Sequence, residues 1–196
     1  MNPPIVERDR VEDPRGPTTL RKVANFVVFQ GAWTVAILAA AHGAPAAAAV
    51  AIAVAVAWHL AVSAAPGREA RLVATVMLIG FVFEMVRLPL HDIAYASGQP
   101  VPWLPPYWLV GMWGLLAITL NVSLRWLHGR WALAALLGLV GGPLSFVAGV
   151  RLGGASFVDR DLALLTLAAG WFLLMPLLTA VAGRLDGVVV PRVGHG

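Results

Sequence analysis

The sequence contains no cysteine and very few charged residues. Only 12% of its 196 residues are Asp, Glu, Lys or Arg, about half of the roughly 25% that is usual in a soluble domain. Without cysteine the chain forms no disulfide, thiolate metal site or iron–sulfur cluster, and it has no thiol nucleophile. The low charge excludes an ordinary soluble enzyme, because a fold of this size leaves much surface that polar residues must cover.

The sequence also lacks the motifs of several large enzyme classes. It has no P-loop, no dinucleotide-binding glycine motif in a βαβ setting, no zinc-protease motif and no nucleophile elbow. An evenly spaced arginine series of the voltage-sensor type is missing too. The net charge of +4 does not indicate nucleic-acid binding, because the arginines lie between apolar runs. We therefore expect no cofactor and no nucleic-acid partner.

What the sequence does contain is apolar residues in long runs. They make up 59% of the chain, and the mean hydropathy is +0.79. A helix needs about 20 predominantly apolar residues to cross the hydrocarbon core of a bilayer. Six runs meet this length: residues 23–42, 46–65, 72–90, 107–124, 131–150 and 162–182. The sequence predicts an all-α, polytopic integral membrane protein, a bundle of six transmembrane helices.

Charge and composition divide the chain into three parts and orient it. Residues 1–20 are polar and rich in proline, which is typical of a disordered tail. Residues 21–184 form the predicted transmembrane domain, and 185–196 a flexible tail. Eleven of the fourteen Lys and Arg residues fall on the side of the two termini and two on the other side. Because cytoplasmic loops are enriched in Lys and Arg, both termini are predicted to be cytoplasmic.

One predicted span carries an acid and a base. Gly80, Glu84, Arg87 and His91 share a stripe of the predicted helix over residues 72–90. Ionisable residues within a membrane are costly, so Glu84 and Arg87 are the catalytic candidates. Four interpretations stay open: a buried salt bridge that fixes helix packing, a proton donor or acceptor facing a cavity, a lipid-headgroup site at Arg87, and a metal site with His91 and Asp92.

Further polar residues lie in other spans. Gln30, His59, Asn121 and Arg125 occupy the half of the spans nearer the termini, and Ser145 lies in the fifth span. Amide and histidine side chains of this kind hydrogen-bond between membrane helices. They are either packing residues or the lining of a cavity. The complete set of cavity or packing candidates is Gln30, Trp33, His59, His91, Asn121, Arg125 and Ser145.

A stripe of glycines follows the predicted fifth span. Gly138, Gly142 and Gly149 recur at steps of four and seven, which places them on one helix face. Small residues let a second helix approach closely, so the stripe predicts a packing seam. The neighbouring helix belongs either to this chain or to a partner, a second copy included. Pro143 removes a backbone hydrogen bond in the same helix and predicts a kink.

The segment between the third and fourth spans is rich in proline and aromatic residues. Residues 91–106 include Tyr95 and Trp103, and Trp108 follows. Aromatic rings favour the interface between membrane and water. Two interpretations remain: an anchor in that interface, or a lid over a site.

Four blocks of sequence resemble a known family. They are residues 25–33 (NFVVFQGAW), 106–113 (PYWLVGMW), 120–127 (LNVSLRWL) and 141–153 (GGPLSFVAGVRLG). In these blocks the chain resembles the bacterial inner-membrane family catalogued as domain of unknown function DUF2878, over about residues 24–182. The resemblance implies a location in the bacterial inner membrane and a lipid-related role, with no established activity.

Two functional hypotheses follow. The first is a non-catalytic protein that binds or transports membrane lipids or assists another protein. The alternative is an intramembrane enzyme that modifies a lipid or isoprenoid, with Glu84 as the acid or base. Either hypothesis gains if Glu84, Gln30, Asn121 and Ser145 converge on a partly apolar cavity. A Glu84 sealed against Arg87 without such a space excludes the enzyme.

Overall fold

The computed structural model describes residues 16–188. Six α-helices follow one another: α1 (Thr19–Ala41), α2 (Pro45–Ala61), α3 (Pro66–Arg87), α4 (Tyr107–Leu120), α5 (Trp131–Arg151) and α6 (Arg160–Arg184). Two short strands, β1 (Ile93–Tyr95) and β2 (Ala155–Phe157), and two 3₁₀ turns complete the described part of the chain.

The predicted helical class and the six helices are confirmed, whereas the number of membrane spans is confirmed only in part. Four helices are long and apolar enough to cross a membrane: α1, α3 with the 3₁₀ turn that follows it, α5 and α6. Helices α2 and α4 have 17 and 14 residues, which at about 1.5 Å per residue gives about 25 and 21 Å. Both are shorter than the hydrocarbon core of about 30 Å.

Two predicted helix boundaries were wrong. The third span was predicted to begin at residue 72, after a connecting segment, but α3 begins at Pro66. Proline is favoured in the first turn of a helix, because the N–H that it lacks has no helical partner there. The span expected to reach residue 124 ends at Leu120, and residues 121–124 form turns. Asn121 and Ser123 use their side chains in contacts with other helices, which competes with a continued helix.

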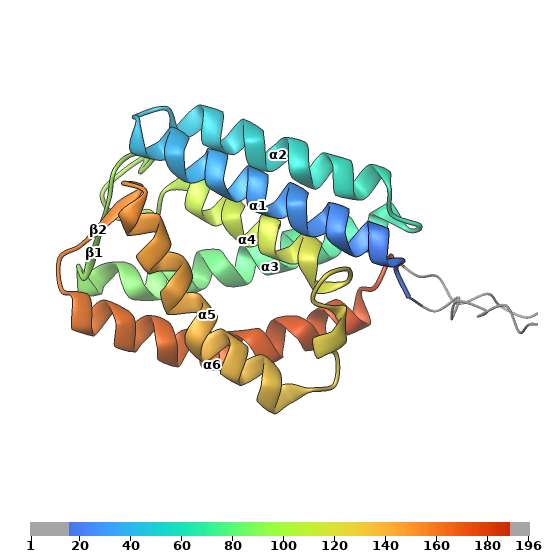
Figure 1. The fold of residues 1–196 in the computed structure, drawn as a ribbon. Helices are drawn as coiled ribbons and strands as arrows, with labels where there is room; N and C mark the ends of the chain where they lie inside the picture. The colour runs from blue at the N-terminus through green and yellow to red at the C-terminus, as the bar shows by residue number, and fades with distance from the viewer. Residues whose placement is uncertain (1–15, 189–196) are drawn as a thin grey trace, which may run out of the picture.

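Five helices stack in levels and the sixth crosses them. Figure 1 shows α1 and α2 at the top, α3 and α4 in the middle and α6 at the bottom, with α5 running obliquely from beside α6 up to the end of α1. Helix α4 is central, since it packs against α1, α2, α3 and α6. Trp108, Trp113 and Leu115 of this helix are almost completely buried. The central position explains why a helix of 14 residues is held in the bundle.

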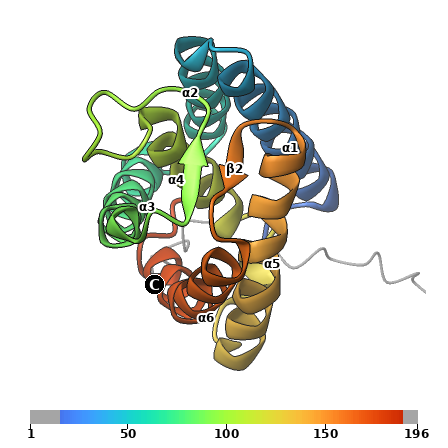
Figure 2. The ribbon, with the colours of Figure 1, turned by 90° about the vertical axis from the view of Figure 1, so that its left-hand side faces the viewer.

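A two-stranded ribbon closes one end of the bundle. Strands β1 and β2 pair antiparallel, with Ala94 opposite Ser156. In Figure 2 they lie across the end of the bundle between α3 and α5. We call this the ribbon end; the opposite end, where α1 begins and α6 ends (Figure 1), is the terminal end. The sequence did not indicate this ribbon, because strands of three residues show no periodicity and pair here across about sixty residues.

The outward surfaces of the long helices are apolar. Val86 of α3 is 71% exposed, and Leu165 and Leu173 of α6 are 68% and 69% exposed. Soluble proteins rarely leave such apolar surface uncovered over several helices. The exposed side chains therefore suit lipid as the surrounding medium.

The predicted tails are described only in part. Residues 1–15 and 189–196 lie outside the described residues. Within the predicted C-terminal tail, Gly187 and Val188 are buried against the bundle. Within the predicted N-terminal tail, Thr18 caps α1 by accepting a hydrogen bond from the N–H of Arg21.

Candidate functional site

An elongated cavity lies between the helices. Its volume is about 240 Å³, and α1, α3, α4, α5, α6 and the ribbon all contribute to its walls. Along α5 the wall extends from Leu137 to Gly149, which corresponds to about 18 Å of helix. Most of the wall is apolar or aromatic; the lining residues include Phe29, Trp33, Trp108, Met112, Trp113, Phe146 and Trp171.

Glu84 is the acidic residue in this wall. Its side chain is 2% exposed. One carboxylate oxygen, Oε2, lies 3.7 Å from Nη1 of Arg87 and accepts a hydrogen bond of 3.4 Å from the Tyr95 hydroxyl. The other oxygen, Oε1, is buried and has no hydrogen-bond partner. An unpaired buried acceptor is uncommon in folded proteins, so it marks Glu84 as a candidate functional residue.

Arg87 is held more tightly by Asp92 than by Glu84. Its Nη2 donates a hydrogen bond of 2.7 Å to Oδ2 of Asp92, and the Thr166 hydroxyl lies 3.1 Å from the same oxygen. The predicted Glu84–Arg87 pair therefore exists, but as the longer of two ion pairs. Because the Arg87–Asp92 contact is 1.0 Å shorter than the Arg87–Glu84 contact (2.7 Å against 3.7 Å), Glu84 is the more weakly paired of the two carboxylates.

The ribbon positions the groups around Glu84. Strand β1 carries Tyr95 into the cavity wall, and Val158, which follows β2, donates its N–H to the carbonyl of Asp92. Burial first, and the neighbouring Glu84 second, raise the pKa of Tyr95 well above its ordinary value. The phenol is therefore protonated and remains a hydrogen-bond donor to Glu84.

Glycines of α5 bring Trp171 of α6 into the wall. A Cβ added to Gly138 would lie 2.1 Å from the Trp171 carbonyl oxygen, and one added to Gly142 would lie 2.3 Å from its side chain. The Trp171 ring stacks on Trp113 with centroids 4.9 Å apart. The predicted glycine seam thus joins α5 to α6 within this chain at Gly138 and Gly142. Contact of the stripe with a second copy stays a prediction.

Only some of the predicted cavity residues reach the cavity. Trp33 and Ser145 line it together with Glu84. Gln30 is exposed on α1, and His91 is exposed after the third helix, where its φ of 51° turns the chain toward the ribbon. Neither is among the lining residues. The expected stripe from Glu84 to His91 breaks because α3 ends at Arg87.

Residues 91–106 were predicted to be either an anchor in the membrane interface or a lid over a site, and individual residues fit each alternative. Trp103 is 68% exposed, as an interfacial anchor would be. Tyr95 and Trp108 line the cavity instead, and the Trp108 indole donates a hydrogen bond of 2.8 Å to the carbonyl of Ser97. Within residues 91–106, Tyr95 is therefore the residue that lies in the cavity wall, and whether the segment acts as a lid stays a prediction.

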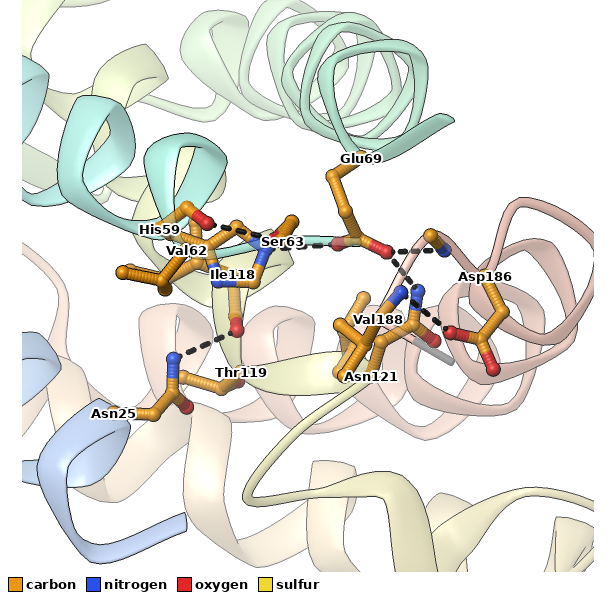
Figure 3. Close-up of polar contacts among 12 residues, drawn as sticks. Asn25, His59, Val62, Ser63, Glu69, Ile118, Thr119, Asn121, Asp186 and Val188 are labelled. Atoms are coloured by element: carbon orange, nitrogen blue, oxygen red, sulfur yellow. Dashed lines mark hydrogen bonds and ion pairs between the residues drawn. The ribbon is translucent and has the colours of Figure 1, made fainter. Parts of the chain in front are cut away.

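The remaining predicted residues meet at the terminal end, around a residue that sequence patterns did not single out. Glu69 is completely buried, and both of its oxygens are engaged (Figure 3). Oε2 lies 2.8 Å from Nε2 of His59, while Oε1 accepts hydrogen bonds of 2.9 Å from Asn121 and 2.7 Å from the N–H of Gly187. We call these four residues the Glu69 cluster. The signal that was available is an acid three residues after Pro66, in the first turn of a helix.

Arg125 lies beside the Glu69 cluster. Its Nη1 is 2.5 Å from Oδ2 of Asp186, and both side chains are partly exposed. Ala65 donates its N–H to the carbonyl of Gly187, so that residues 185–188 are tied to the start of α3. His59, Asn121 and Arg125 therefore hold the chain together at this end and do not line the cavity.

Few polar groups face the cavity, and each can be named. It combines a long apolar wall with one weakly paired carboxylate, a protonated phenol and the indole N–H of Trp171, which is buried without a partner. Among residues 16–188 there is no group of three or more His, Asp and Glu side chains that could hold a metal ion. The cavity can therefore hold an apolar molecule and hydrogen-bond its polar group.

Fold and site together define a helical protein with four helices apolar enough to cross a membrane and a cavity between its helices. The chain belongs to the DUF2878 family, whose description is "Protein of unknown function" and whose sequence profile matches residues 22–177. The resemblance noted from the four sequence blocks is thus confirmed. Neither the curated proteins nor the solved structures contain a match.

Proposed function

We propose that this protein is a non-catalytic, lipid-binding protein of the bacterial inner membrane, which holds the apolar chain of a lipid or isoprenoid between its helices. The observation that carries the proposal is the cavity of about 240 Å³, whose wall is apolar over about 18 Å of α5 and contains the buried carboxylate of Glu84. A long apolar space with few polar groups fits a chain-shaped ligand, because the polar groups fix the orientation of such a ligand.

Filling the cavity tests this proposal. A Cβ added to Gly141, which lines the cavity, meets nothing within 4 Å. The variant Gly141→Leu therefore adds a bulky side chain at the wall from a position where the Cβ itself meets no neighbour, and leucine favours a helix more than glycine does. We expect the purified variant to retain much less lipid than the wild type when both are extracted and analysed by mass spectrometry.

The matched control is Gly31→Leu. A Cβ added to Gly31 also meets nothing within 4 Å, but this glycine is exposed on α1 and does not line the cavity. This variant is expected to retain the wild-type lipid. Equal lipid content in the wild type and both variants would contradict the proposal.

An intramembrane enzyme is the second candidate function. Its support is Oε1 of Glu84, a buried carboxylate oxygen without a partner beside the cavity, since a general acid or base must reach its substrate. Arg87 would then set the charge of the site. The test compares the lipids of cells that carry the wild type with those of cells that carry Glu84→Gln. An unchanged lipid profile together with normal folding contradicts catalysis by Glu84.

We further propose that all six helices lie within the membrane and that the terminal end faces the cytoplasm. The support is the excess of Lys and Arg near that end. Because the chain has no cysteine, a single introduced cysteine gives an unambiguous label. An impermeant maleimide should label Gln99→Cys, near the ribbon end, in whole cells, and Ala64→Cys, near the terminal end, only after permeabilisation. The reverse pattern would overturn the orientation.

A further inference from the structure

Two buried polar atoms of the cavity residues have no hydrogen-bond partner. They are Oε1 of Glu84, an acceptor when the carboxylate is ionised, and the indole N–H of Trp171, a donor. Burying either group without a partner is unfavourable, so such groups are rare unless a ligand, an ion or water satisfies them. Both residues line the same cavity.

Three other polar groups of the wall have partners within the chain. The Ser145 hydroxyl donates a hydrogen bond of 2.7 Å to the Gly142 carbonyl. The Tyr95 hydroxyl donates to Oε2 of Glu84, and the Trp108 indole donates to the Ser97 carbonyl. Among the fully buried atoms of the wall, the unmet requirement is therefore for one donor, at Glu84, and one acceptor, at Trp171.

This pair of requirements selects among the polar groups that a lipid can carry. A carboxylate or phosphate accepts hydrogen bonds but donates none to Glu84, and its charge would be repelled. Arg87 does not compensate: its Nη2 is held by Asp92 at 2.7 Å. Its buried Nε has no partner, but Arg87 is not among the residues that line the cavity. An ammonium group donates but offers nothing to Trp171, and it would lie near the Arg87 charge. A hydroxyl both donates and accepts.

We propose that the ligand is a long-chain alcohol, whose hydroxyl donates a hydrogen bond to Glu84 and accepts one from Trp171. This inference rests on the proposed lipid-binding function and adds the chemical class of the polar group. The chain of the alcohol lies along the apolar wall formed by residues such as Phe29, Trp33 and Met112. An isoprenoid alcohol and a fatty alcohol share this chemistry.

The experiment uses the tryptophans of the cavity as reporters. Trp33, Trp108, Trp113 and Trp171 line it, so a brominated chain that enters quenches their fluorescence. Four probes share an octadecyl chain brominated in its middle and end in a hydroxyl, a carboxylate, an amine or a methyl group. They are titrated into the purified full chain in detergent. We expect the alcohol to bind about tenfold more tightly than the alkane, because it gains two hydrogen bonds.

The variant Trp171→Phe removes the donor and keeps a ring that can stack on Trp113. It should weaken binding of the alcohol about fivefold and leave binding of the alkane unchanged, which also shows that the variant is folded. The control is Trp126→Phe, since Trp126 is 49% exposed and does not line the cavity. This control should behave as the wild type does.

Each outcome decides between the two proposals. If no probe quenches the fluorescence, lipid binding itself is wrong, and this inference falls with it. If all four probes bind equally, or the acid or amine binds best, lipid binding stands and the alcohol is overturned. Displacement of the brominated alcohol by geranylgeraniol or by hexadecanol then distinguishes an isoprenoid from a fatty chain.

Discussion

Helix α3 carries two buried carboxylates in opposite surroundings. Glu69, near the terminal end, has partners for both oxygens from His59, Asn121 and the Gly187 N–H. Glu84, four turns further along, has one long ion pair, one hydrogen bond of 3.4 Å and an oxygen with no partner. Glu84 borders the cavity of about 240 Å³, and Glu69 is not among the residues that line it.

The difference separates a structural site from a candidate binding site. A buried carboxylate is tolerated where hydrogen bonds replace the water that it loses. The Glu69 cluster supplies all of them to the Glu69 carboxylate from the chain, so this carboxylate needs no ligand; the atom of the cluster without a partner is Oδ1 of Asn121. The surroundings of Glu84 supply them only in part, and a ligand can provide the rest. Burial alone would not have distinguished the two, because Glu69 is 0% exposed and Glu84 2%.

The largest expected effect is on the Glu69 cluster. Glu69→Ala leaves His59, Asn121 and the Gly187 N–H without their buried acceptor, and we expect the free energy of unfolding to fall by about 3–5 kcal/mol. Titration with SDS in mixed micelles measures it. Glu69→Gln keeps an acceptor for Asn121 and Gly187 and should lose much less. A loss below about 1 kcal/mol for the alanine variant would show that the cluster is not structural.

An intermediate effect is expected at the cavity wall. Gly138→Ala forces a methyl group toward the Trp171 backbone, where a Cβ would lie 2.1 Å from the carbonyl oxygen. We expect a loss of about 1–3 kcal/mol in the same assay, because α5 and α6 must separate. The matched variant is Gly141→Ala, whose Cβ meets nothing within 4 Å. It should be neutral or slightly stabilising; equal losses in both would contradict the close α5–α6 packing.

The smallest effect on stability is expected at Glu84. Glu84→Gln keeps an acceptor for Tyr95 and removes only the longer of the two ion pairs of Arg87. The free energy of unfolding should change by no more than about 1 kcal/mol. The affinity for the brominated alcohol, measured by fluorescence quenching, should fall clearly even though the free energy of unfolding hardly changes. If Glu84→Gln lowered the free energy of unfolding as much as Glu69→Ala does, Glu84 would be a structural residue too, and the distinction between the two carboxylates would be wrong.

Some of the site residues could be predicted from the sequence and others could not. Glu84, Arg87, Trp33 and Ser145 were predicted because polar and aromatic residues in a membrane helix are unusual, and three of them line the cavity. Gln30 was predicted by the same argument, yet its side chain lies on the outer face of α1. Residue type indicates that a polar group needs a partner, and the rotation and packing of the helices decide where the partner is.

Glu69 is the opposite case, a buried polar residue that the sequence patterns did not single out. It was overlooked because the third span was predicted to begin at residue 72, whereas α3 begins at Pro66. The partners of Asp92 and Tyr95 could not be predicted either, since a ribbon that pairs residues about sixty positions apart holds these two side chains beside Arg87 and Glu84.

Local patterns along the chain were enough for the helical class, the number of helices and the family, because apolar runs, turn residues and sequence blocks are properties of short segments. They also singled out the Glu84–Arg87 pair, since charge is rare in these runs. The packed fold was needed to show that Arg87 is held chiefly by Asp92, that Glu69 is saturated and that an apolar cavity adjoins Glu84. These features depend on which side chains from distant segments fill the same space, and no local pattern encodes that.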